Sequence, residues 1–197
     1  AHPDVKALVI TGNGSAFCAG GQLADITADK LMLENIYSGF LCIAQCSLPT
    51  IAAVNGPAVG AGFNMAVGCD VRIVTENARF EPRFFGLGLH PGGGNTWMLR
   101  QIANWNTAAG MLLFSQSLSG QQAVDKGLAW ACVPADELID SAFRFTENIQ
   151  NLPKQLLVET KQTLRTAGGT NEHDEIVELE TIRQINSLTQ PFAQNAI

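Results

Sequence analysis

Two glycine-rich segments carry the most suggestive chemistry in this chain, because each follows an apolar run typical of a buried strand. They are Ile10–Leu23 (ITGNGSAFCAGGQL) and Ala52–Val74 (AAVNGPAVGAGFNMAVGCDVRIV). Small residues after a strand let a ligand approach the backbone N–H groups. In the second segment, Gly60-Ala61-Gly62 begins a predicted helix, where free N–H groups and the helix dipole favour negative charge. Two such donors on one oxygen would form an oxyanion hole; for any single glycine, a tight turn or close packing is the alternative interpretation.

Few side chains near these segments are able to move a proton. His90 lies in the loop sequence GLGLHPGGG, and an imidazole exchanges protons near neutral pH. A histidine hydrogen-bonded to the loop backbone is the competing interpretation. Glu81 lies earlier in the same loop, where we expect a solvated surface carboxylate.

Several other site classes lack support in the sequence. The stretch GLGLHP (86–91) is one residue short of the GxGxxG dinucleotide motif and has no suitably spaced acidic residue after a strand. The sequence contains no GxSxG nucleophile motif and no cluster of residues at metal-ligand spacing. We therefore expect neither a metal nor a bound cofactor.

Alternating strands and helices must position these loops, and their pattern is typical of parallel βαβ units followed by a helical tail. The predicted strands are Val5–Thr11, Ile51–Val54, Val71–Thr75 and Ala129–Val133. The predicted helices are Leu31–Cys46, 60–68, Asn95–Ala103, Thr107–Phe114, Ser119–Lys126, Ala135–Gln150, Pro153–Ala167 and Asn171–Leu188. Ser119 is expected to cap its helix, and Phe80–Gly94 is predicted to be a loop.

Composition limits the classes of partner. The 197 residues suffice for one substantial core, and the formal net charge of −6 leaves no basic stripe to displace counterions from nucleic acid. No apolar run is long enough to cross a membrane and no signal peptide opens the sequence, so we expect a cytoplasmic protein without nucleic-acid or membrane partners. The five cysteines have no CxxC spacing and are expected to be reduced thiols.

Taken together, these motifs resemble the crotonase superfamily, the enoyl-CoA hydratase/isomerase family. The family's strand–TG–FCAGGxL pattern is matched by Val9–Leu23, and its PxIAAVNGxAxGxG pattern, which ends in CD, by Pro49–Asp70. Its PGxG segment, which ends in LxR, is matched by Pro91–Arg100. The stretches LSGQQAVDKGLAWACVP and LPKQLLVETKQTL are similar to later parts of the family sequence.

The resemblance implies an α/β, crotonase-like (ββα)n spiral core over residues 1–134 and a helical trimerisation region over 135–197. It implies a coenzyme A thioester as substrate and a homotrimer or a dimer of trimers. In such a fold the N–H groups of Gly21 and Ala61 would hold the thioester oxygen and stabilise an enolate. The neighbouring residues expected to line the substrate site are Ala19, Gly20, Gly60, Gly62, Phe84, Pro91 and Gly92.

The chain departs from the family pattern where hydratases carry two glutamates. The first position is Asn64, whose amide cannot act as a base but could hold a water, and the second is Phe84. The aspartate common after the first glycine pair is replaced by Gln22, and the family's preceding segment with an R-P-x-x-x-N-A-L motif is missing. We therefore expect an acyl-CoA enzyme that hydrates poorly, with Gly21, Ala61, Asn64 and His90 as candidate catalytic residues.

Three alternative functions stay open. The chain could be a non-catalytic acyl-CoA-binding protein that keeps the oxyanion hole. It could catalyse a different crotonase reaction that uses His90, such as hydrolysis, decarboxylation or a double-bond shift. A structural oligomer without a ligand is the third.

Overall fold

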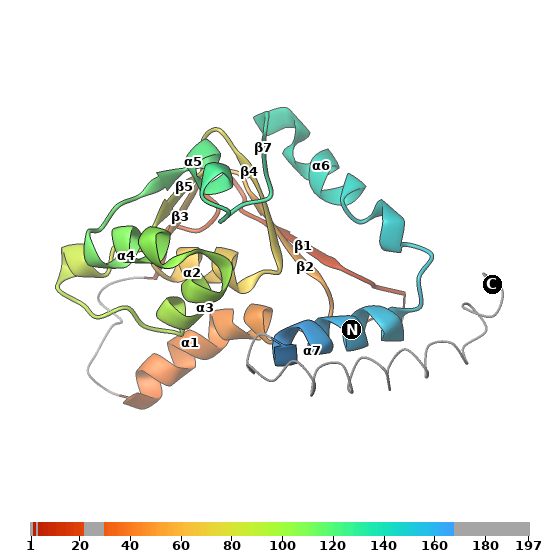
Figure 1. Cartoon of the computed structure of the whole chain (residues 1–197), viewed down its shortest axis with the longest axis horizontal. Coiled ribbons are helices and arrows are strands. Elements are labelled where there is room, and N and C mark those ends of the chain that lie inside the picture. Colours follow the sequence, from red (N-terminus) through yellow and green to blue (C-terminus); the bar gives the residue numbers. More distant parts are fainter. Residues whose placement is uncertain (1, 3, 22–29, 168–197) are drawn as a thin grey trace. The chain divides into compact units, whose positions relative to one another are not determined.

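A computed structural model describes residues 2, 4–21 and 30–167 of the chain (Figure 1). Its residues group into two compact units. The larger unit comprises the described residues of Val9–Cys46 and Thr50–Phe145, and the smaller one those of Ala1–Leu8, Ser47–Pro49 and Thr146–Ile197. The division of the chain after residue 134 stays a prediction. Gln22 and the predicted helix Asn171–Leu188 of the expected trimerisation region lie outside the described residues.

The larger sheet contains the four strands that the sequence predicts. They are β1 (Leu8–Thr11), β2 (Thr50–Val54), β4 (Val71–Thr75) and β7 (Ala131–Val133), in the order β1-β2-β4-β7. Strands β2 and β4 pair in parallel, as do β4 and β7. Every residue of β2 is buried, as is usual for a central parallel strand. The predicted parallel pairing of alternating strands and helices is therefore confirmed.

A second, smaller sheet contains three strands that the sequence patterns did not reveal. Strands β3 (Pro57–Val59) and β5 (Arg79–Glu81) pair in parallel, and β6 (Leu118–Ser119) pairs antiparallel to β5. Strand β5 and the 3₁₀ turn η2 (Phe85–Leu87) also show that Phe80–Gly94 is not wholly a loop. Strands of two or three residues are too short to show an alternation of apolar and polar residues.

Most predicted helices are confirmed to within a few residues. They are α1 (Lys30–Ala44), α2 (Ala61–Gly68), α3 (Asn95–Ile102), α4 (Trp105–Leu113), α5 (Gly120–Asp125) and α7 (Lys154–Ala167). The predicted single helix Ala135–Gln150 is wrong, because the segment forms η3 (Ala135–Glu137), α6 (Leu138–Arg144) and η4 (Glu147–Ile149). Thr146 and Asn148 disfavour a continuous helix there, since both residue types have low helix propensity.

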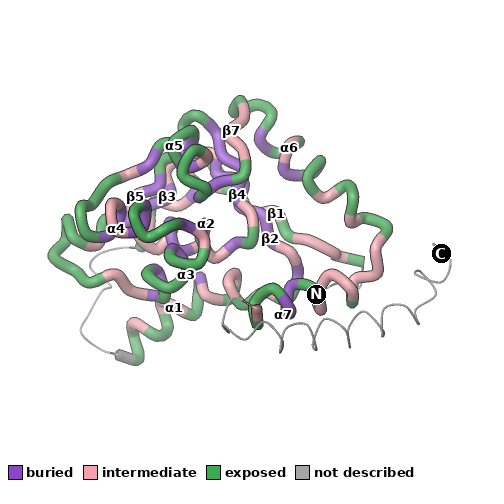
Figure 2. Tube along the Cα trace, in the orientation of Figure 1, coloured by how far each residue is buried: buried purple, intermediate pink, exposed green. Residues whose placement is uncertain are grey.

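The core of the larger unit lies on both faces of the four-stranded sheet. Ala52 and Val54 of β2 face a cluster that contains Phe63 of α2 and Phe80 of β5, two fully buried rings in edge-to-face contact at 6.0 Å. The alternate residues Ile51 and Ala53 face a second cluster with α6. Figure 2 shows buried segments along strands β3, β4 and β5 and along α2. Helix α2, which bears the predicted donor, is thus anchored by its apolar face.

The buried Arg72 and the exposed Asp70 hold the C-terminal end of α2 and the start of β4 in place. Arg72 donates hydrogen bonds to the carbonyls of Leu128 (2.5 Å) and Cys69 (2.6 Å) among others. Burial lowers the pKa of Arg72 to about 10, an effect that the charges of Cys69 and Asp70 oppose. Asp70 accepts hydrogen bonds from the backbone N–H (2.7 Å) and hydroxyl (3.0 Å) of Thr50, which ties the end of α2 to β2.

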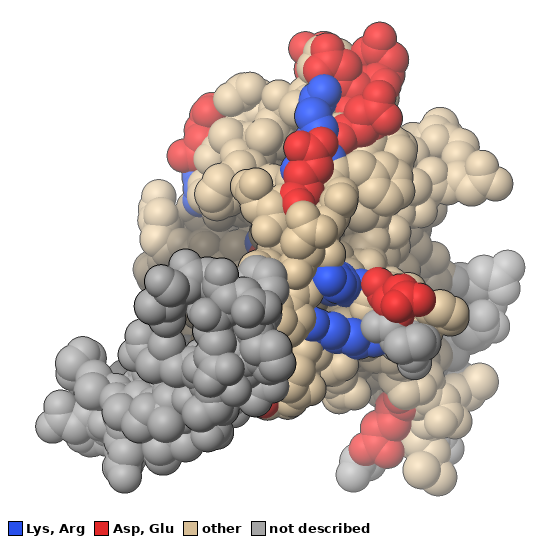
Figure 3. All heavy atoms as spheres, turned by 90° about the vertical axis from the view of Figure 1, so that its right-hand side faces the viewer, with Lys and Arg blue, Asp and Glu red and all other residues tan. Residues whose placement is uncertain are grey.

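The surface of the described residues carries a cluster of acidic side chains. Acidic side chains gather over η3 and α6 at the top of the face in Figure 3, where Asp136, Glu137 and Asp140 lie. No helix among the described residues is long and apolar enough to cross a membrane. All five cysteines are free thiols, as expected, although only Cys69 is buried.

Candidate functional site

The two glycine-rich segments lie side by side, as an oxyanion hole would require. The N–H groups of Phe17 and Cys18 both donate to the carbonyl of Pro57 at 3.1 Å, and the N–H of Val59 donates to the carbonyl of Cys18 at 2.9 Å. This short parallel pairing brings the chain before Gly20 alongside β3, directly before α2.

Gly20 and Gly62 permit this close approach. Gly20 has a φ of +96°, a conformation that side chains disfavour, and a β-carbon there would lie 2.9 Å from the Val59 carbonyl oxygen. The same β-carbon would lie 3.9 Å from the backbone nitrogen of Ala61. A β-carbon on Gly62 would lie only 2.1 Å from the Cys18 carbonyl oxygen. Both positions therefore require glycine for the two segments to meet.

Ala61 begins helix α2 and presents its N–H group at the helix start. Gly60 before it has a φ of +54°, and its own N–H donates to the Glu81 carbonyl at 2.9 Å. The N–H of Ala61 has no acceptor within the helix, and none among the described residues. Gly21 is exposed, and no described heavy atom lies within 4 Å of the place where its β-carbon would be. Ala19, the other predicted residue of this loop, is exposed as well.

Asn64 is buried and forms part of an amide network. Its Nδ2 donates to the carbonyl of Gly92 at 3.0 Å, and its Oδ1 accepts from Nδ2 of Asn95 at 2.6 Å. Only 2% of Asn64 and 1% of Asn95 are exposed. We expected an amide that could hold a water. Instead, both Nδ2 and Oδ1 of Asn64 already have a hydrogen-bond partner in the protein. The sequence did not lead us to predict Asn95 as a site residue. Its position after the PGGG motif, at the start of a predicted helix, could have indicated it.

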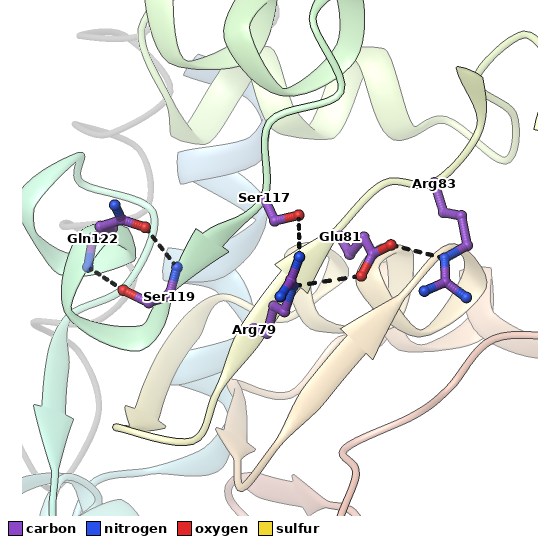
Figure 4. Close-up of polar contacts among 6 residues, drawn as sticks. All are labelled: Arg79, Glu81, Arg83, Ser117, Ser119 and Gln122. Atoms are coloured by element: carbon purple, nitrogen blue, oxygen red, sulfur yellow. Dashed lines mark hydrogen bonds and ion pairs between the residues drawn. The ribbon is translucent and has the colours of Figure 1, made fainter. Parts of the chain in front are cut away.

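The loop that supplies a glutamate in hydratases places no carboxylate at Phe84, which lies half-buried at the start of η2. The nearest acid, Glu81, pairs with Arg83 at 2.8 Å and with Arg79 at 3.6 Å (Figure 4). Its side chain is 22% exposed, so the expected solvated carboxylate is wrong. The hydrogen bond that Arg83 donates to Glu81 raises the pKa of Arg83, and the carboxylate charge adds to this effect. Glu81 is therefore engaged in a local ion cluster.

His90 is exposed, and its Nδ1 lies 2.8 Å from the carbonyl oxygen of Pro91. A carbonyl only accepts hydrogen bonds, so Nδ1 carries a proton, and in the neutral imidazole Nε2 is the acceptor. This is the backbone-bonded histidine that the sequence offered as the competing interpretation. Pro91 and Gly92 are half-buried, and Gly92 contacts both Asn64 and the hydroxyl end of Tyr37 in α1. Tyr37, like Asn95, was not among the predicted site residues.

The arrangement has the groups for binding an anionic oxygen, and lacks those for binding a metal. Among residues 2, 4–21 and 30–167, no three His, Cys, Asp or Glu side chains group as metal ligands would. What the loops offer is backbone N–H at the start of α2, next to a loop of small residues. Such a site stabilises negative charge that develops on a carbonyl oxygen.

Known proteins are similar to this chain in sequence and in fold. A model of the family described as enoyl-CoA hydratase/isomerase matches residues 1–191. A probable enoyl-CoA hydratase of Mycobacterium tuberculosis, EchA14, is 39% identical over 96% of this chain and 77% of its own length. The 1,2-epoxyphenylacetyl-CoA isomerase of Escherichia coli is 34% identical over 89% of this chain and 70% of its own.

A solved structure gives the same result for the fold. A putative enoyl-CoA hydratase from Thermobifida fusca, solved in complex with acetoacetyl-CoA, superposes with a TM-score of 0.85 at 27% identity. The match covers 95% of this chain and 80% of that one. The α/β crotonase-like fold expected from the motifs is thereby confirmed, and the chain belongs to the enoyl-CoA hydratase/isomerase family, the crotonase superfamily.

Proposed function

We propose that this chain binds an acyl-CoA thioester and stabilises its enolate through the N–H groups of Gly21 and Ala61. The observation that carries the proposal is the meeting of the two glycine-rich segments. Gly20 lies against Val59 and Ala61, and the N–H of Ala61 has no acceptor among the described residues. The acetoacetyl-CoA bound to the Thermobifida relative supports a ligand of this class.

The chemistry follows from the position of the donors. Two N–H groups that bind a thioester oxygen draw electron density from the carbonyl, which makes the protons on the α-carbon more acidic. The gain is larger for the enolate than for the thioester, so the contact accelerates the reaction and does more than tighten binding. Only backbone atoms take part, which explains why alanine at position 61 suits the role as well as glycine.

The reaction itself is proposed to differ from ordinary hydration. A hydratase adds water with two carboxylates, and here those positions hold a buried amide and an apolar ring, Asn64 and Phe84. We favour an enzyme of this family whose reaction follows from the enolate alone. The isomerase relative favours an isomerisation of a CoA thioester, with Nε2 of His90 as the proposed proton acceptor. A non-catalytic acyl-CoA-binding protein is the alternative.

Substitutions at Ala61 test the donor directly. Proline removes the N–H while remaining compatible with the first turn of a helix, whereas glycine keeps the N–H. The measured quantity is the absorbance shift of a chromophoric enoyl thioester on binding, which reports polarisation of the carbonyl. Ala61→Gly should retain the shift, and a folded Ala61→Pro should lose most of it, since one such donor contributes roughly 3 kcal/mol. An equal shift in folded Ala61→Pro would remove Ala61 from the proposal.

Calorimetry tests the ligand class. The chain should bind butyryl-CoA, and should not bind free butyrate with similar affinity, because only the thioester brings both the carbonyl and the coenzyme to the site. The separate alternative of a structural oligomer predicts binding of neither compound. Turnover of a thioester by the unaltered chain and its loss in His90→Gln would distinguish an enzyme from a binding protein.

A further inference from the structure

Tyr37 places its hydroxyl against the loop that faces helix α2. A β-carbon on Gly92 would lie 2.4 Å from the Tyr37 hydroxyl oxygen, so the hydroxyl occupies the space that a side chain at position 92 would need. The ring is half-buried and packs against Phe40 with centroids 5.7 Å apart. The hydroxyl has no hydrogen-bond partner among the described residues, although a tyrosine inside a protein usually finds one.

A second unpartnered polar atom belongs to Asn95, the first residue of α3 directly after this loop. The carbonyl of Gly92 can only accept, which fixes the Asn64 amide with Nδ2 toward it and Oδ1 toward Asn95. Asn95 must therefore turn Nδ2 to Asn64, as it does at 2.6 Å. This leaves Oδ1 of Asn95 buried and without a donor among the described residues. Such an acceptor costs roughly 1–3 kcal/mol unless a donor reaches it.

Both groups are linked to helix α2 through Asn64, which bonds to Gly92 and Asn95. Asn64 follows Ala61 by three residues in α2, which is less than one helical turn of about 5.4 Å. Gly92 bonds to Asn64, contacts the Tyr37 hydroxyl and accepts from the N–H of Asn95 at 3.4 Å. The two unpartnered groups thus lie at the same short segment, residues 92–95, next to α2.

We propose that Tyr37 and Asn95 form a polar subsite that selects acyl groups carrying a hydroxyl on the chain. A hydroxyl both donates and accepts, so one ligand group satisfies both partners: it donates to Oδ1 of Asn95 and accepts from the hydroxyl of Tyr37. A plain hydrocarbon chain leaves both unpaired. This inference rests on the proposed binding of acyl-CoA, and makes Tyr37 and Asn95 specificity-determining residues.

Calorimetric titration with three CoA esters tests the subsite. The probes are butyryl-CoA, 3-hydroxybutyryl-CoA and 4-hydroxybutyryl-CoA, which differ only in the presence and position of the hydroxyl. One of the hydroxylated esters should bind the chain about three- to tenfold more tightly than butyryl-CoA, the range expected for one neutral hydrogen bond. Equal affinities would overturn the subsite, because a trapped water rather than the ligand would then satisfy Asn95.

Variants assign the effect to its residues. Tyr37→Phe keeps the ring and its packing on Phe40 and should reduce the preference to less than twofold. Ser38→Ala is the matched control, because it deletes an exposed hydroxyl of the same helix that donates to the Asn35 carbonyl, and the preference should persist. Asn95→Ala, checked for folding by circular dichroism, should also reduce it.

The outcomes separate the two proposals. Binding of butyryl-CoA without any hydroxyl preference contradicts only the subsite. A preference that survives Tyr37→Phe contradicts the assignment to Tyr37. Failure of all three esters to bind contradicts the proposed function and the subsite together.

Discussion

Asn64 and Asn95 share a hydrogen bond inside the protein, and this bond decides what either amide can offer a ligand. With one N–H bonded to Gly92 and one lone pair occupied by Asn95, Asn64 is held in a single orientation. A group held in this way positions its neighbours and cannot take up a proton from water. The amide pair therefore shapes the site and does not replace a glutamate.

Hydration of crotonyl-CoA should consequently be slow. We expect a rate about 10²–10⁴-fold below that of a hydratase with both glutamates, the usual cost of losing a positioned acid or base. The assay is the loss of enoyl absorbance, and the double substitution Asn64→Glu with Phe84→Glu is the arm expected to raise the rate. Ordinary hydratase turnover by the unaltered chain would show that another pair of groups activates the water.

Gly92 gives a second test at the residue scale. Its β-carbon would collide with the Tyr37 hydroxyl at 2.4 Å, so Gly92→Ala should destabilise the fold by about 1–3 kcal/mol. In a Tyr37→Phe background the nearest ring carbon is 3.2 Å away, and the same substitution should cost much less. Urea unfolding of the four proteins in this double-mutant cycle measures the coupling. If the destabilising effects of the two substitutions simply add, the Tyr37 hydroxyl does not lie against Gly92.

The sequence indicated the backbone part of the proposed site and not the polar side chains of the proposed subsite, for a physical reason. Glycines at positions 20, 60 and 62 are readable because a close approach or a positive φ demands them locally. Tyr37 and Asn95 gain their meaning only when α1 and the 92–95 loop come together. Nothing in the spacing of a helical tyrosine indicates which loop its hydroxyl will touch.

At the scale of elements, the structure confirms the sequence prediction that Ser119 caps the start of α5. Ser119 accepts from the N–H of Gln122 at 3.3 Å, and the Gln122 side chain accepts from the N–H of Ser119 at 2.9 Å (Figure 4). This reciprocal capping box satisfies two N–H groups that the helix cannot. Long periodic helices and capped starts are therefore predictable, whereas β3, β5 and β6 depend on pairing partners distant in sequence.

Removing the cap should weaken the fold measurably. We expect Ser119→Ala to lower the free energy of unfolding by about 1 kcal/mol, as measured by urea denaturation. Ser117→Ala is the matched control, because that hydroxyl only accepts from the exposed guanidinium of Arg79 at 3.2 Å. If Ser119→Ala and Ser117→Ala lower the free energy of unfolding equally, the capping box does not stabilise the fold measurably.

At the scale of the whole molecule, several large apolar side chains face outward. On α3 and α4 these include Trp97 (64% exposed) and Trp105 (68%), followed by Phe114 (71%). Aromatic side chains are enriched in protein interfaces, and an exposed group of this size usually marks a contact with another chain. The trimerisation region expected at 135–197 has an outward apolar residue of its own in Leu164 (70%).

We propose that these side chains are covered by other copies of the chain, in a homotrimer or a dimer of trimers. Light scattering should then give three or six times the 21.0 kDa of one chain. Phe114→Glu buries an unpaired charge at the contact and should shift the protein toward the monomer, whereas Phe114→Leu should keep the assembly. Leu164→Glu tests the C-terminal region in the same way. If this variant dissociates and Phe114→Glu does not, the contact lies within residues 135–197. A monomeric mass for the unaltered chain at micromolar concentration would contradict the assembly, because three exposed aromatic side chains within 18 residues would then lack the partner that their exposure demands.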